Sequence, residues 1–119
     1  MNNAFFFDSS EAIPLPPEDV RLINFTAQPY PDGKRVRVMA EATPFQVRPW
    51  IEITMSDADG DEVAYANIVE PMNYKVEITM HIRRADPRGK YSLAARLFYP
   101  EKPDNDKKTI EFEVTEIQN

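Results

Sequence analysis

The chain has 119 residues, of which 42% are hydrophobic and 29% charged, so its composition predicts one ordinary globular domain with a modest core. It contains no cysteine, which excludes disulfides and thiolate metal sites, and no apolar run approaches the roughly 18 residues of a membrane span. The formal net charge of -6 argues against nucleic acid or an anionic membrane as a partner.

Residues 1–19 are predicted to form an acidic, proline-rich leader ahead of a domain at residues 20–119. The leader contains no Lys or Arg, and its proline run at residues 13–17 favours an extended, polyproline-like path. The aromatic run Phe5, Phe6 and Phe7 is unusual for a solvated tail. We expect these rings either to pack onto the domain or to dock a partner.

The N-terminus has neither the basic region nor the apolar stretch of a signal peptide. This favours a cytoplasmic location, although a secreted protein whose signal had been trimmed fits the same sequence.

After residue 20 the chain is a succession of short runs with period-two alternation, separated by turn residues about every ten positions. None of the 11 prolines falls inside a run, and all 3 glycines fall in turns. The pattern predicts an all-β fold, a seven-strand antiparallel sandwich. The expected strands are residues 20–28, 35–43, 50–56, 62–69, 74–83, 89–99 and 107–116.

The run at residues 89–99 alternates most regularly, and its core-facing residues are Tyr91, Leu93, Ala95, Leu97 and Tyr99.

At residues 20–28, Ile23, Phe25 and Ala27 are expected to share one face. Residues 44–49 have proline at both ends and are too long for a tight hairpin, so we expect them to cross from one sheet to the other.

This arrangement resembles the immunoglobulin-like and fibronectin-type-III-like sandwiches, and the stretch that carries the resemblance is Gly89-Lys90-Tyr91-Ser92-Leu93. The resemblance implies that Tyr91 is the corner tyrosine, whose hydroxyl bonds a nearby backbone group. Two positions depart from antibody domains. Leu93 stands where they have cysteine, and Trp50 falls on the outward register of its strand.

Catalytic and cofactor motifs are not found in the sequence, so we expect no enzyme activity and no cofactor. His81 is the only histidine, which argues against a zinc site, and its parity places it on an outer sheet face. The serines, Ser9, Ser10, Ser56 and Ser92, lie in no nucleophile-turn motif, and no glycine-rich phosphate loop is present.

Asp57, Asp59 and Asp61 fall within five residues around an Asp-Gly pair. Asp-Gly between alternating runs is a strong hairpin signal, and we favour a plain hairpin here. Clustered carboxylates also suit a hard cation, so a weak calcium site is the alternative.

The outward faces give the most specific functional hypothesis. If the third, sixth and seventh strands are antiparallel neighbours, Trp50 lies next to Phe98, and Glu52 lies near Arg96 with Glu111 or Glu113 beyond. An aromatic pair ringed by matched charges is typical of a binding patch. The competing interpretation is that the leader covers this patch within the same chain.

We therefore expect a protein-interaction or assembly module that acts through this patch, with the phenylalanine run as a second contact. The partner is another protein or a second copy, because exposed edge strands pair with copies of themselves. The alternative is a carbohydrate- or calcium-binding accessory module of a cell-surface or extracellular protein.

Overall fold

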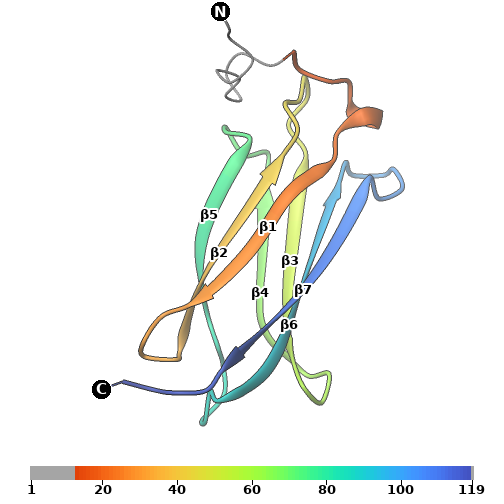
Figure 1. The fold of residues 1–119 in the computed structure, drawn as a ribbon. Coiled ribbons are helices and arrows are strands. Elements are labelled where there is room, and N and C mark those ends of the chain that lie inside the picture. The colour runs from red at the N-terminus through yellow and green to blue at the C-terminus, as the bar shows by residue number, and fades with distance from the viewer. Residues whose placement is uncertain (1–12, 119) are drawn as a thin grey trace, which may run out of the picture.

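The computed structural model describes residues 13–118 and shows seven strands in two antiparallel sheets, which confirms the predicted β-sandwich (Figure 1). A short 3₁₀ turn, η2 (Pro17–Asp19), precedes the strands. The strand order is β1-β2-β5 in one sheet and β4-β3-β6-β7 in the other. The strands are β1 (Leu22–Pro29), β2 (Arg35–Ala42), β3 (Trp50–Asp57), β4 (Glu62–Val69), β5 (Lys75–His81), β6 (Gly89–Phe98) and β7 (Asp106–Val114).

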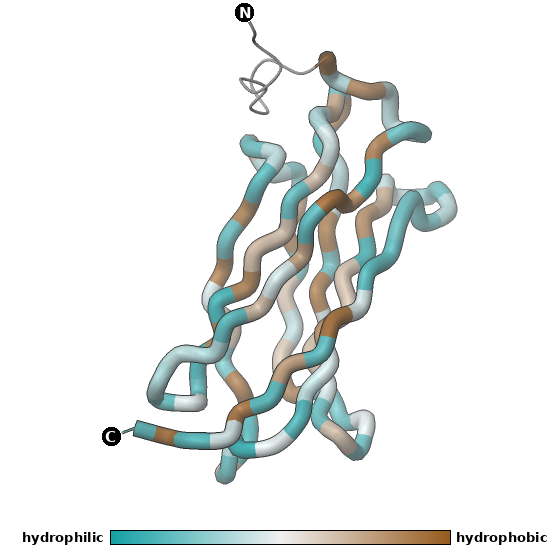
Figure 2. The backbone as a smooth tube through the Cα atoms, in the orientation of Figure 1, coloured by the Kyte–Doolittle hydropathy of each residue, from teal (hydrophilic) through white to brown (hydrophobic). Residues whose placement is uncertain are grey.

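The core lies between the two sheets and is built from alternate residues of each strand. Apolar and polar residues alternate along β2, β3 and β6 (Figure 2), and the apolar set is buried. No polar or charged residue within 13–118 is buried. The residues with at most 1% exposure on these strands are Val36, Val38, Ala40, Ala42, Ile51, Ile53, Met55, Leu93, Ala95 and Leu97.

Strand β6 is central to its sheet, with β3 on one side and β7 on the other. At its start the buried Tyr91 hydroxyl donates a 2.5 Å hydrogen bond to the carbonyl of Pro87, and the ring stacks on Phe112 at 5.3 Å. This is the corner tyrosine that the resemblance implied. The bond fixes the turn that leads into β6.

The first strand departs from the predicted parity. The register of β1 with β2 shifts between Leu22 and Asn24, so a bulge interrupts the alternation there. Ile23 is therefore 48% exposed, whereas Phe25 is buried, and the expectation that both share one face was wrong.

Residues 44–49 cross between the sheets as predicted, since they connect β2 in one sheet to β3 in the other. Leu15 forms a parallel bridge with Phe45 in this crossing. The Leu15 N–H donates to the carbonyl of Pro44, and the Gln46 N–H donates to the carbonyl of Leu15, both at 2.9 Å. The described part of the predicted leader is thus held against the crossing, whereas Phe5, Phe6 and Phe7 lie outside the described residues.

Across residues 13–118, no helix has the length and hydrophobicity that crossing a membrane requires.

Candidate functional site

The predicted aromatic pair forms on the outer face of the four-stranded sheet. Trp50 opens β3 and Phe98 ends β6, and the two residues are direct cross-strand partners. Their ring centroids are 5.9 Å apart with an interplanar angle of 52°, and both side chains are half-buried. The guanidinium carbon of Arg96 lies 3.9 Å from the centroid of the Phe98 ring, which is a cation–π contact.

Arg96 also joins two carboxylates. Its Nη1 lies 2.6 Å from Oδ1 of Asp104, and its Nη2 lies 3.0 Å from Oε1 of Glu52. The other oxygen of Glu52 accepts a 2.5 Å hydrogen bond from the Tyr65 hydroxyl on β4. The guanidinium of Arg96 on β6 therefore joins β3 to the loop between β6 and β7, and Tyr65 is joined to it through Glu52. The set Trp50, Phe98, Arg96, Glu52, Asp104 and Tyr65 is called the outer patch below.

The electrostatics of the outer patch favour the ionised carboxylates. The hydrogen bond from Tyr65, followed by that from Arg96, lowers the pKa of Glu52 below its ordinary value. The hydrogen bond from Arg96 likewise lowers the pKa of Asp104, and the bond to Glu52 raises the pKa of the Tyr65 hydroxyl. The patch therefore keeps one fixed charge pattern at neutral pH.

The prediction that Glu52 lies near Arg96 is confirmed, but the prediction that Glu111 or Glu113 lies beyond it is wrong. Across from Arg96 on β7 is Lys107, whereas Glu111 faces Ser92 and Glu113 faces Lys90. Asp104, from the loop between β6 and β7, takes the place expected of Glu111 or Glu113, because a loop residue can reach back over the strand end.

Two members of the outer patch, Tyr65 and Asp104, were not predicted. Tyr65 could have been found from the parity of its strand, because β4 pairs with β3 and places Tyr65 opposite Thr54, diagonal to Glu52. Asp104 gave no comparable signal, since its loop has no periodic pattern.

Apolar side chains continue from the outer patch toward the edge strand β4. Val69 is the cross-strand partner of Trp50 and is 50% exposed. Tyr65 is 46% exposed, and Val47 and Met72, just before β3 and just after β4, are exposed as well. Tyr65 and Val69 therefore extend the apolar surface of the outer face beyond one aromatic pair.

The outer face of the three-stranded sheet carries charged side chains and one ion pair between β2 and β5. Arg37 Nη2 lies 2.6 Å from Oε2 of Glu77, and both side chains are about half exposed. His81 lies opposite Arg35 on this face and is exposed. Ser56 and Ser92 pair with each other in the opposite sheet, so the described residues bring no serine to His81.

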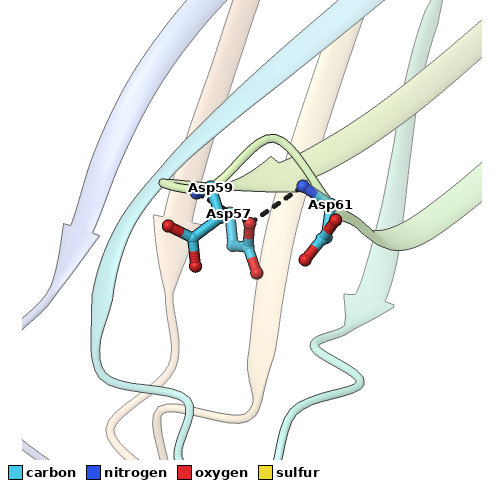
Figure 3. Close-up of side chains that lie close together, drawn as sticks. All are labelled: Asp57, Asp59 and Asp61. Atoms are coloured by element: carbon cyan, nitrogen blue, oxygen red, sulfur yellow. Dashed lines mark hydrogen bonds between the residues drawn. The ribbon is translucent and has the colours of Figure 1, made fainter.

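The three aspartates meet at the β3–β4 turn (Figure 3), where their oxygens lie within 4.8 Å of one another. Oδ1 of Asp57 accepts hydrogen bonds from the N–H groups of Asp59 (3.0 Å) and Asp61 (2.9 Å), and Arg84 lies 4.0 Å from its other oxygen. These contacts close the predicted hairpin. Calcium binding here stays the alternative to a plain hairpin, and a calcium titration of the melting temperature with Asp59→Asn as control would check it.

Comparison with known proteins gives matches only at the level of structure. No protein-family model matches the chain, and no curated protein sequence matches it. A solved β-glucuronidase from Bifidobacterium dentium, complexed with coumarin-3-O-glucuronide, is similar to 82% of this chain with a TM-score of 0.64 and 16% identity. The match covers 18% of that enzyme.

Two further solved structures show the same fold. A Lactobacillus rhamnosus β-glucuronidase is similar to 81% of this chain, with a TM-score of 0.52 and 17% identity, over 16% of the enzyme. A computationally redesigned β-sandwich protein is similar to 82% of this chain, with a TM-score of 0.58 and 12% identity, and 97% of that protein is covered. The chain thus spans under a fifth of the glucuronidases that it resembles. At these identities the likeness establishes a β-sandwich of the immunoglobulin-like kind, and no specific family.

Proposed function

We propose that this chain is a non-catalytic binding module that recognises a partner protein through the outer patch. The observation that carries the proposal is the position of Arg96, which contacts the Phe98 ring, Glu52 and Asp104 at once. A side chain tied at three points loses little further freedom when a partner covers it. Preorganisation of this kind lowers the entropic cost of binding.

The chemistry of the outer patch indicates what the partner presents. The carboxylates of Glu52 and Asp104 face Arg96 and Lys107, so the charges in this region balance. A partner then gains most from burying apolar surface against Trp50 and its neighbour Val69, within a polar rim. We expect the partner to contribute an apolar or aromatic side chain at that point and hydrogen-bond donors toward the carboxylates.

Photo-cross-linking from the two outer faces tests the proposal. Ala94 on the outer face of β6 and Thr79 on the outer face of β5 are both exposed, and each is replaced in turn by benzoylphenylalanine. We expect an adduct in extracts of the source cells from position 94, and loss of that adduct when Trp50→Ala is added. Arg37→Ala, on the opposite sheet, is the matched control and should leave the adduct intact.

Adducts from position 79 alone, or an adduct from position 94 that survives Trp50→Ala, would contradict the proposal. Melting curves of each variant separate loss of binding from loss of fold.

Carbohydrate binding is the second candidate. Aromatic rings stack on sugars, and the Trp50 and Phe98 rings lie side by side here. Beside them are the carboxylate of Glu52 and the guanidinium of Arg96, which can form hydrogen bonds with sugar hydroxyls. Several of the structural neighbours are β-glucuronidases, and the Bifidobacterium dentium enzyme among them holds a glucuronide.

Trp50 is the only tryptophan, so its fluorescence reports directly on the outer patch. Titration with a β-glucuronide at millimolar concentrations should give a saturable change that Arg96→Met abolishes. An unchanged spectrum would rule out this glucuronide at the outer patch.

A further inference from the structure

Within residues 13–118, each sheet ends in strands that pair with a neighbouring strand on one side only, and these edge strands are β1, β5, β4 and β7. Three of them carry features that oppose pairing with another chain. Strand β1 has its bulge at Ile23 and ends in Pro29. Strand β5 has the charged residues Lys75 and Glu77 on its outer face. Strand β7 has the charged Lys108 on its core-facing register, opposite the buried Ala95.

Strand β4 lacks these features over most of its length. Residues 63–69 contain neither a charged residue nor a proline. The register shift with β3 is confined to the start of the strand, so the ladder is regular from Ala64 to Val69. Among residues 13–118, the hydrogen bond to the outer edge of β4 is the 3.0 Å bond from the Arg83 N–H to the carbonyl of Val63.

The alternation of backbone groups shows which residues the edge offers. The Glu70 N–H donates to the carbonyl of Pro49, just beyond the β3–β4 pairing. Because hydrogen-bonded and non-hydrogen-bonded pairs alternate in an antiparallel ladder, Ile68 and Ala66 bond toward β3. Tyr65, Asn67 and Val69 therefore direct their N–H and C=O groups outward, and Asn67 is the middle of these three.

We propose that β4 pairs antiparallel with β4 of a second copy, about a two-fold axis at Asn67. Asn67 then lies opposite the partner's Asn67, and Tyr65 lies opposite the partner's Val69 on both sides of the axis. Each of these pairs exchanges both of its backbone hydrogen bonds, as facing residues in the bonded positions of an antiparallel ladder do. The interface is isologous, which is the form that a closed dimer requires.

The side chains fit this register. An aromatic residue opposite a β-branched one is a favourable cross-strand pair, and Tyr65 and Val69 are each about half exposed in the single chain. Asn67 carries no charge, so no like charges face each other at the axis. Strand pairing alone buries little surface, and we expect a reversible dimer at the weak end of specific interfaces.

The dimer joins two four-stranded sheets edge to edge and places both outer patches on one continuous face. A partner with two binding sites would then engage both patches with increased avidity. The inference does not depend on the proposed function, because the pairing is made by the backbone groups along the edge of β4. The side chains of Tyr65 and Val69, which border the outer patch, lie next to this edge.

Sedimentation velocity of the full chain over a wide concentration range tests the inference. We expect a monomer–dimer equilibrium that Asn67→Lys shifts to monomer, because two like charges would then meet across the axis. Thr79→Lys, an exposed position on edge strand β5, is the control and should leave the equilibrium unchanged. A chain that stays monomeric throughout, or a dimer that Asn67→Lys leaves intact, would overturn the proposal.

Disulfide trapping gives a second measurement that does not rely on loss of assembly. The chain has no cysteine of its own. In the proposed register the two Asn67 Cα atoms lie about 5.5 Å apart, within the range that a disulfide spans. Asn67→Cys should therefore form a covalent dimer on mild oxidation, whereas Thr79→Cys should remain monomeric. Equal trapping of both variants, or of neither, would contradict the pairing.

Discussion

The corner bond between Tyr91 and Pro87 should make a large and measurable contribution to stability. Tyr91 is 2% exposed, and its hydroxyl donates at 2.5 Å to the carbonyl of Pro87, which is itself buried. Tyr91→Phe keeps the ring on Phe112 but leaves that carbonyl without a donor. A buried polar group left unpaired costs about 1–3 kcal/mol.

The melting temperature turns this cost into an observable. With an unfolding entropy of about 2.1 cal/mol/K per residue, a chain of this length loses about 4 °C for each kcal/mol. We therefore expect Tyr91→Phe to melt about 4–12 °C below the native chain, as followed by circular dichroism.

Tyr65→Phe is the matched control for this measurement. It removes a hydrogen bond of the same 2.5 Å length, from Tyr65 to Glu52, at a side chain that is 46% exposed. Water replaces the lost partner there, so little change is expected. If the two variants have the same melting temperature, the corner bond does not stabilise the turn, and the role assigned to Tyr91 is wrong.

Two further perturbations test the outer patch and the turns. The Tyr65 hydroxyl, and then Arg96, hold the folded pKa of Glu52 below its unfolded value, so this contribution is present above about pH 4.3 and is lost as pH falls through the folded pKa. The urea concentration at half-unfolding should fall between neutral and acid pH, and it should fall less in Arg96→Met than in the native chain. An equal fall in both would refute the role of Arg96 in lowering the pKa of Glu52. Gly33→Ala should lower the melting temperature more than Gly60→Ala. Both glycines have positive φ, but only at Gly33 does an added Cβ meet a neighbouring side chain, at 2.9 Å; equal drops would refute the packing argument.

Strand parity predicted the core because it is uninterrupted where the sheets are regular. Along β3 and β6 every second residue is buried, so Ile53 and Leu93 could be assigned from the sequence alone. The cross-strand placement of Trp50 next to Phe98 followed from the same parity, once β3 and β6 were taken as antiparallel neighbours.

Prediction from the sequence failed where the backbone departs from regular strand pairing. A bulge reversed the exposure of Ile23, and no residue type in that run marks a bulge. The loop after β6 brings Asp104 into contact with Arg96, and this contact depends on loop conformation and not on the strand period. The outer patch was therefore predictable in its strand residues and not in its loop residue.

The most direct test of the central proposal observes Trp50 while a partner is bound. Because Trp50 is the only tryptophan, labelling with 5-fluorotryptophan places a single fluorine signal in the outer patch. The partner that cross-linking identifies is first purified in free form, and gel filtration verifies that it binds the labelled chain. We predict that the chemical shift of the fluorine resonance changes in the complex and that Arg96→Met reduces this change. An unchanged chemical shift in a verified complex would show that the partner binds elsewhere.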